Sequence, residues 1–228
     1  MQKENLEQQI ENQLKRFEQA VGEDVFVRDG IVDVAKYLKA PIKILWILKE
    51  ANSPKNDLPD MRPNLASLIG EIPNIIDPKW AKTWRPIVRC VYGIFENKGF
   101  EYIKTMDDEV EIVEYMKKVA HINVKKYAGG SKAQETEMKN FYKKYKDFLH
   151  EQIEIINPDV LIFGGTFHYF DEDYFAGKNQ IKTWRPIFQW KNKLLIDTFH
   201  PVQSQISAEE YCDEIINAVR KWKQEMQK

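Results

Sequence analysis

Four short, mostly apolar runs constrain the fold of this 228-residue chain more than any other feature. They lie at 42–48, 118–124, 159–163 and 193–199, and long segments with helical spacing separate them. Runs of this length and continuity indicate strands that are buried on both faces, which are typical of parallel sheets covered by helices. We therefore predict an α/β fold of three α/β/α layers around a central, mainly parallel four-stranded sheet.

The segments outside these runs carry apolar residues at steps of three and four, which predicts amphipathic helices. The longest predicted helices lie at 2–20, 79–98, 107–117 and 134–156, and a last one extends from a Ser207 cap to about Gln227. Asn64 is predicted to cap a short helix that reaches Ile69. Pro86 favours a start of the 79–98 helix near Arg85, because proline is best tolerated in the first turn.

The length of the chain fits one domain, so we predict a single domain over 1–228, with a helix at 1–22 packed on it or extending from it. No apolar run approaches the roughly 18 residues that a membrane-spanning helix needs. The polar start of the sequence lacks the apolar centre of a signal peptide. We therefore expect a cytoplasmic protein that does not bind a membrane.

Cysteine content and net charge limit the classes of function. Cys90 and Cys212 are the two cysteines, too few for an iron–sulfur cluster or a cysteine-rich zinc site. The spacing of His, Asp and Glu indicates no metal site, and we expect no metal and no cofactor. With 34 basic and 35 acidic residues, the net charge is −1, so contact with nucleic acid would require a local basic patch.

Ligands of open parallel α/β sheets bind outside the carboxyl ends of the strands. The candidate site therefore consists of the four loops that begin at Lys49, Lys125, Gly164 and His200.

The residues of these loops form a recognisable order. The first strand leads into Lys-Glu-Ala-Asn-Ser-Pro at 49–54, and the second contains Ile-Asn-Val-Lys at 122–125. The third follows a proline and ends in two glycines within 158–165, and the last ends at His200-Pro201. In this order the motifs resemble those of the uracil-DNA glycosylase superfamily, over roughly residues 42–220.

The resemblance implies a uracil-DNA glycosylase-like fold and assigns roles to named residues. Glu50 would orient water or stabilise a cationic sugar, and His200 would stabilise the negative charge on the departing base. Asn123 would read the edge of a flipped base, because an amide both donates and accepts hydrogen bonds. The full set of implied substrate-binding residues is Asn123, Asn52, Gly164, Lys125 and Ser131.

A basic, glycine-containing loop follows the second strand. Its Gly129-Gly130-Ser131 stretch could bring backbone N–H groups close to a phosphate. Lys125, Lys126 and Lys132 are predicted to add positive charge there. The expected partner is DNA, or a nucleobase or nucleotide, and the sequence specifies no protein partner.

The sequence also departs from the family pattern. The first loop lacks the two glycines of the family's Gly-Glu-Ala-Pro-Gly form, and Lys49 replaces the first of them. Ser204 stands in for the serine that follows His-Pro directly in the family. Two alternatives therefore remain open: a catalytically inactive relative that binds a nucleotide, nucleic acid or protein, and a hydrolase of small nucleoside-like substrates.

Each site residue also has a purely structural interpretation. Glu50 could be a solvated loop carboxylate. Asn123 could bond neighbouring backbone where its strand ends, and His200 could be satisfied by a backbone carbonyl.

Overall fold

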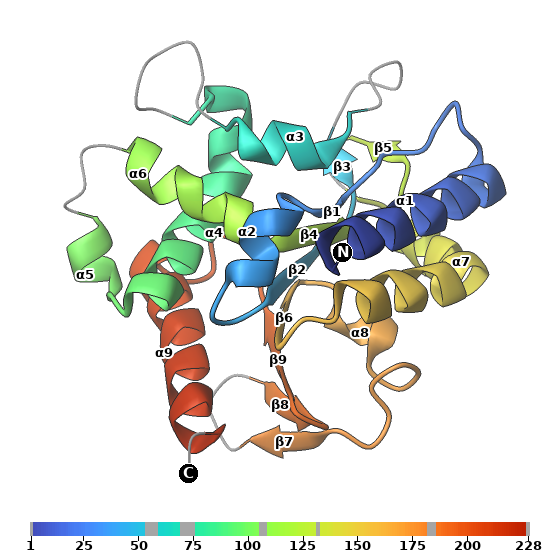
Figure 1. Ribbon diagram of the computed structural model, residues 1–228. Coiled ribbons are helices and arrows are strands. Elements are labelled where there is room, and N and C mark those ends of the chain that lie inside the picture. Colours follow the sequence, from blue (N-terminus) through green and yellow to red (C-terminus); the bar gives the residue numbers. More distant parts are fainter. Residues whose placement is uncertain are drawn as a thin grey trace.

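The computed structural model describes residues 2–52, 59–68, 76–104, 109–130, 133–181 and 186–226. It is an α/β structure built on a seven-stranded sheet with the order β1-β4-β2-β6-β9-β8-β7 (Figure 1). The strands are β1 (Gly30–Ile31), β2 (Ile44–Leu48), β4 (Ala120–Asn123), β6 (Val160–Gly164), β7 (Asn179–Ile181), β8 (Ile187–Trp190) and β9 (Lys193–Thr198).

The four predicted runs form β4, β2, β6 and β9, which are parallel to one another at the centre of the sheet. The predicted number of four strands was wrong, because β1, β8 and β7 extend the sheet by antiparallel pairing at its two sides. These three strands escape detection for a physical reason. β1 has two residues, and β7 and β8 lie near the sheet edge with partly exposed side chains, so none forms a continuous buried run.

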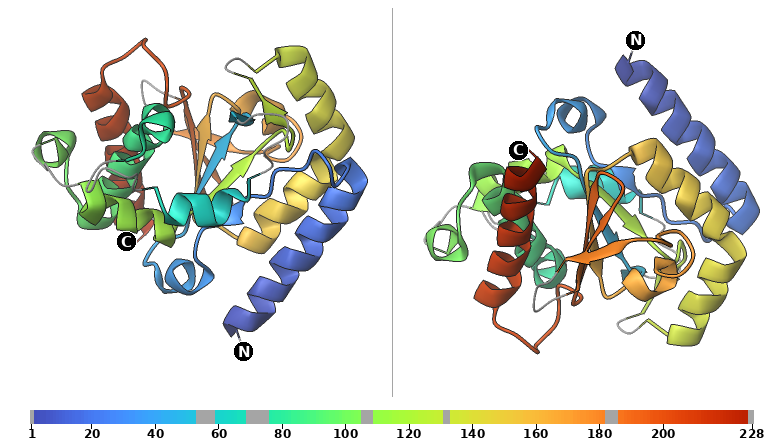
Figure 2. Two further views of the ribbon diagram at one scale, coloured as in Figure 1. Left: turned by 90° about the horizontal axis from the view of Figure 1, so that it is seen from above. Right: turned by 90° about the horizontal axis from the view of Figure 1, so that it is seen from below.

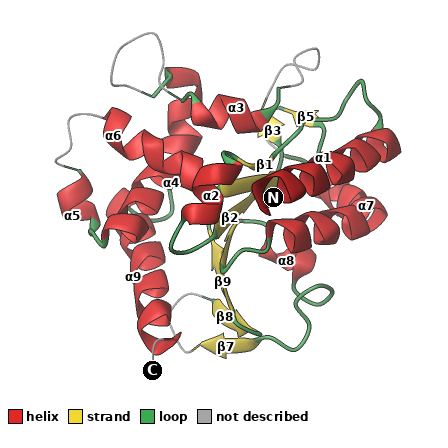
Figure 3. Cartoon of the chain, in the orientation of Figure 1, coloured by secondary structure: helices red, strands yellow, loops and turns green. Residues whose placement is uncertain are grey.

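Helices cover both faces of the sheet, as Figures 2 and 3 show. The core on one side of the sheet includes residues of α3 (Met61–Ala66), α4 (Pro78–Glu96), α5 (Phe100–Ile103), α6 (Glu109–Val113) and α9 (Ala208–Met226). The core on the other side includes residues of α1 (Gln2–Val21), α2 (Val34–Lys39), α7 (Glu135–Ile156) and α8 (Phe167–Phe170). Side chains alternate between the two cores along each strand, so that Trp46 faces α4 and Ile47 faces α7.

Helix boundaries agree with the sequence prediction for α1, α7 and α9. The Ser207 cap is confirmed: Ser207 Oγ accepts the Glu210 N–H at 3.1 Å, and the Glu210 carboxylate accepts the Ser207 N–H at 2.9 Å. This reciprocal pair is a capping box. It fixes where α9 begins, directly after the loop that contains His200.

The predicted start of the 79–98 helix near Arg85 was wrong. α4 begins at Pro78, where the Asp77 side chain accepts the Lys79 N–H, and it continues through Pro86. An interior proline removes a helix hydrogen bond. Trp84, which is 3% exposed, belongs to the extra turns, and burying it offsets that loss.

Two further boundaries differ from the prediction. α3 is capped by Asp60, whose carboxylate accepts the Arg62 N–H at 3.0 Å, and Asn64 lies inside the helix. The helix predicted at 107–117 is α6 followed by a 3₁₀ helix, η1 (Glu114–Lys118). Within the described chain, no helix is both long and apolar enough to cross a membrane.

Candidate functional site at the carboxyl edge of the sheet

The loops that follow β2 and β4 run side by side beyond the ends of their strands. Backbone hydrogen bonds continue from Val124 N to Leu48 O and from Lys125 N to Lys49 O, both at 2.9 Å. Farther out, β3 (Ala51–Asn52) pairs with β5 (Ala128–Gly129) in a parallel two-stranded ribbon. The two predicted loops therefore form one rigid extension at the carboxyl edge of the sheet.

Glu50 and Lys125 meet across this extension. Lys125 Nζ lies 2.5 Å from Glu50 Oε2, and the two side chains are 7% and 5% exposed. Lys125 Nζ also lies 2.9 Å from Glu137 on α7, whose side chain is 62% exposed. Burial alone would lower the pKa of Lys125, but its bonds to the two carboxylates outweigh burial and raise it. Lys125 is therefore a cation held between a buried and an exposed carboxylate.

Gly129 lies directly against the Glu50 carboxyl group. A Cβ atom at position 129 would lie 2.1 Å from Glu50 Cδ and Oε1, closer than nonbonded atoms approach. A Cβ at the neighbouring Gly130 would meet nothing within 4 Å. The absence of a side chain at Gly129 is thus what allows Glu50 to occupy its position.

Asn123 ends β4 with its side chain on the face that α4 covers. The residue is 2% exposed, and its backbone N–H donates to Asp29 Oδ2 at 2.8 Å. Its side-chain Nδ2 is buried and has no hydrogen-bond partner in the described part of the chain. The hydroxyl of Thr198, at the end of β9, is also buried and without a hydrogen-bond partner among the described residues. Unpartnered buried polar atoms are rare, and a bound ligand or an ordered water explains them.

His121 lies on the same strand face as Asn123, two residues earlier. Its ring stands edge-on to Trp84 of α4, with 4.8 Å between the ring centroids. Burial, with smaller contributions from the charges of Lys126 and His200, lowers the pKa of His121 to about 3. The Asn123 amide opposes part of this shift, although its geometry falls short of a hydrogen bond. His121 is therefore neutral at pH 7.

His200 follows β9, against the two glycines that end β6. A Cβ at Gly164 would lie 3.3 Å from Pro201 Cδ and 2.5 Å from Leu48 Cδ2, so that position has no room for a side chain. A Cβ at Gly165 would lie 3.7 Å from both His200 N and Lys49 Cε. Gly164 therefore lets Leu48 and Pro201 close onto the end of β6, whereas Gly165 has ordinary contact distances and instead supplies a left-handed backbone turn with φ of 70°.

The protonation state of His200 follows from these contacts. Burial and then the charge of Lys49 lower the pKa of His200 to about 4. His200 Nδ1 accepts the Val202 N–H at 3.3 Å. A neutral ring with an accepting Nδ1 carries its proton on Nε2. His200 therefore has the form that donates a hydrogen bond from Nε2.

The predicted site residues fall into two groups at the same edge. Glu50 and Lys125 form one group beside α7, and the charge of Glu50 reaches Tyr169 of α8. His200 and Gly164 form the other, and Asn123 points toward α4. Among the described residues, Glu50 and His200 form no hydrogen bond or ion pair with each other.

The remaining predicted residues have less distinctive positions. Asn52 is exposed in β3, opposite Gly129, and Ser131 lies outside the described residues. Gly164 is buried, so its part in a site would be to allow close packing behind it.

Lys126 does not add charge to the loop, contrary to the sequence prediction. Its side chain is 0% exposed and its ammonium lies 2.6 Å from Asp29 Oδ1 and 2.9 Å from Gln152 Oε1. Gln152 in turn donates to Asp29 Oδ1 at 3.0 Å. This buried network anchors β4 through Asp29. Sequence reasoning missed Asp29, which directly precedes the two-residue strand β1 and belongs to no recognisable motif.

Neither a search for metal-binding groups nor comparison with known proteins assigns a further role to this site. The described residues contain no group of three or more His, Cys, Asp or Glu placed to hold a metal ion. Comparison with known proteins finds neither a family model nor a curated protein that matches this chain.

Proposed function

We propose that this protein is a divergent uracil-DNA glycosylase-like protein that binds a flipped base or nucleotide at the carboxyl edge of its sheet and hydrolyses the N-glycosidic bond. The observation that carries the proposal is the buried, unpartnered Nδ2 of Asn123 at the end of a parallel strand. A buried donor without a partner costs about 1–3 kcal/mol. A base whose edge accepts this hydrogen bond would remove that cost.

The neighbouring groups fit the charges that develop in the reaction. The C1′–N bond breaks with its electron pair leaving on the base, while water adds its oxygen to C1′ and the proton that water releases ends on the departing base. His200 Nε2–H would donate to the base oxygen as negative charge grows there. The pKa of about 4 makes the ring neutral at pH 7, and since Nδ1 accepts the Val202 N–H, the single ring proton is on Nε2. The Glu50 carboxylate would orient the water or stabilise the cationic sugar.

One observation favours a second candidate, a relative that binds without hydrolysis. The Glu50 carboxylate is 5% exposed and already bonded to Lys125. A carboxylate engaged in this way needs a rearrangement before it can contact water or a sugar. This candidate predicts that binding occurs in the same crevice but that no base is released.

A direct assay separates the candidates. Uracil-containing single- and double-stranded DNA, free uracil and uridine are incubated with the protein, and base release and binding are both measured. Hydrolysis of DNA predicts base release from the oligonucleotides, which Glu50→Gln abolishes without weakening binding. Release from uridine alone would support the nucleoside-hydrolase alternative.

The variants make the outcome decisive. Asn123→Ala should weaken binding about tenfold or more, because it removes the donor that reads the base. If wild-type protein releases no base where a known glycosylase does, hydrolysis is rejected. If it also binds none of the four ligands, the site assignment itself is wrong.

A further inference from the structure

Lys49 brings to the carboxyl edge a positive charge that the proposed reaction does not use. The residue directly follows β2 and is half-buried, and among the residues that the structure describes no hydrogen bond or ion pair engages its ammonium. The neighbouring Glu50 is bound to Lys125 instead. Asp197, near the end of β9, is separated from β2 by β6 and forms no ion pair with Lys49. Partly buried charges usually have a counterion, so this ammonium indicates an anionic ligand.

The side chain of Lys49 extends toward His200. Lys49 Cε and His200 N each lie 3.7 Å from the position that a Cβ at Gly165 would take, so the two atoms are at most twice that distance apart. Burial and then the charge of Lys49 lower the pKa of His200 to about 4, and no carboxylate of the described chain counteracts them. The ring that would donate to the departing base therefore lies in the field of the Lys49 ammonium.

Departure of the base produces a charge that a neutral histidine does not balance. The electron pair of the C1′–N bond stays on the base until the proton released by water reaches it. His200 Nε2–H stabilises this charge with a hydrogen bond but brings no positive charge of its own. An ammonium beside it attracts the anion over several ångströms, most strongly where water is excluded. This attraction acts on the anion formed in the reaction and hardly on a neutral base.

We propose that Lys49 stabilises the negative charge on the departing base, so that the site binds the anion of a uracil-type base more tightly than the neutral base. This inference rests on the proposed function, because Asn123 and His200 must hold the base for Lys49 to act on it. It gives a chemical role to the lysine that replaces the first glycine of the family's loop.

Binding of two bases that differ in charge tests the inference without requiring catalysis. The probes are 5-nitrouracil, which is an anion at neutral pH, and uracil, which is neutral there. Isothermal titration calorimetry of the full-length protein measures both affinities. Lys49→Met should weaken binding of 5-nitrouracil about tenfold and binding of uracil less than about twofold. Lys49→Arg keeps the charge and should retain most of the affinity for 5-nitrouracil.

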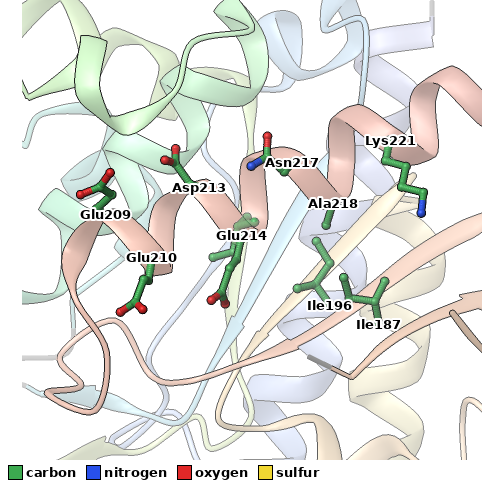
Figure 4. A pocket seen from close by; sticks show the side chains of 10 residues that line it. Ile187, Ile196, Glu209, Glu210, Asp213, Glu214, Asn217, Ala218 and Lys221 are labelled. Atoms are coloured by element: carbon green, nitrogen blue, oxygen red, sulfur yellow. The ribbon is translucent and has the colours of Figure 1, made fainter. Parts of the chain in front are cut away.

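Two further lysines provide matched controls. Lys43 flanks β2 at its other end and is also half-buried, so Lys43→Met makes the same charge change away from the site. Lys221 lines a separate groove between α9 and the strands β8 and β9, which contains none of the predicted site residues (Figure 4). Lys221→Met therefore shows whether 5-nitrouracil binds in that groove instead. Neither variant should change either affinity by more than about twofold.

The outcomes separate the role of Lys49 from the function on which it rests. Equal effects of Lys49→Met on the two bases would overturn that role but leave base binding at the edge in place. A larger effect of Lys221→Met on 5-nitrouracil, or binding of neither base by the wild type, would overturn both. If the preference for the anion depends on Lys49 but no base is released from DNA, hydrolysis is rejected and the anion-binding role of Lys49 stands.

Discussion

Lys125 and Lys126 are adjacent in the chain, yet each belongs to a different region of the molecule. Lys126 points into the core between α1 and α7, where Asp29 and Gln152 surround an ammonium that is 0% exposed. Lys125 points to the carboxyl edge, where it joins Glu50 to the exposed Glu137. Burial outweighs Asp29 and lowers the pKa of Lys126, whereas two carboxylates outweigh burial and raise the pKa of Lys125.

The difference indicates what each ion pair contributes. The Lys126 network connects β4, the segment before β1 and α7, and every hydrogen bond in it joins protein groups to one another. Its role is to hold the sheet together. The Lys125 pair lies at the same edge of the sheet as a second group, which contains the unpartnered Asn123 amide and the neutral His200 and offers a ligand groups to bind. The core region therefore supports the fold, and the edge region carries the candidate chemistry.

The largest expected effect is the loss of the core pair. Lys126→Met leaves the Asp29 carboxylate buried without its cation, which typically costs about 3–5 kcal/mol. Urea unfolding, with the midpoint and slope compared with those of the wild type, measures this cost. A loss below about 1 kcal/mol would contradict the structural role that we assign to this pair.

The second-largest effect is expected from acid, which should lower the free energy of unfolding through two histidines of the edge region. His121 and His200 have pKa values of about 3 and about 4 in the folded protein, below the ordinary value of 6.5. Above pH 6.5 both histidines are neutral in the folded and the unfolded chain, so they do not lower the free energy of unfolding there. Below pH 6.5 the unfolded chain takes up protons that the folded chain does not. The free energy of unfolding therefore falls until the pH reaches the pKa values of the two histidines in the folded protein.

The size of this effect follows from about 1.4 kcal/mol per pKa unit, or roughly 2 kcal/mol for each histidine at pH 5. The free energy of unfolding should therefore be measured by urea titration between pH 7 and pH 4. His200→Gln should make the free energy of unfolding depend less steeply on pH, since glutamine does not titrate. A wild-type stability that stays flat from pH 6.5 to pH 5 would show that these rings are not buried as described.

A smaller effect is expected from filling the space beside Glu50. In Gly129→Ala, the new methyl group would overlap the Glu50 carboxyl group, so the ion pair with Lys125 must move. Overpacking of this kind costs about 1–3 kcal/mol. Gly130→Ala is the control, since its methyl group would meet nothing within 4 Å. Similar unfolding midpoints for the two variants would mean that Glu50 is not held against Gly129.

The sequence predicted the central strands because their signal is local. Burial on both faces produces continuous apolar runs, and β2, β4, β6 and β9 were found from these alone. The same rule failed at the sides of the sheet, where short, partly exposed strands leave no such run. It also failed at Pro86, because the burial of Trp84 decides the start of α4 and depends on tertiary packing.

The candidate site was predictable in position but not in its internal contacts. A parallel sheet places Glu50, Asn123 and His200 at one edge whatever their partners are. The pairing of Glu50 with Lys125 instead depends on the β3–β5 ribbon, and each of its strands has two residues. The opposite directions of Lys125 and Lys126 depend on Asp29, about one hundred residues earlier in the chain, a distance that no local pattern spans.

The smallest expected effect tests the edge pair itself. Lys125→Met removes the cation beside Glu50, but this pair lies at the surface side of α7, where the exposed Glu137 shows that water is close. We expect a loss of about 1–2 kcal/mol, smaller than for Lys126→Met, because solvent compensates part of the lost charge. Urea unfolding of both methionine variants under the same conditions provides the measurement. If Lys125→Met is as destabilising as Lys126→Met, the edge pair is a structural element like its neighbour, and the role of Glu50 in chemistry loses its main support.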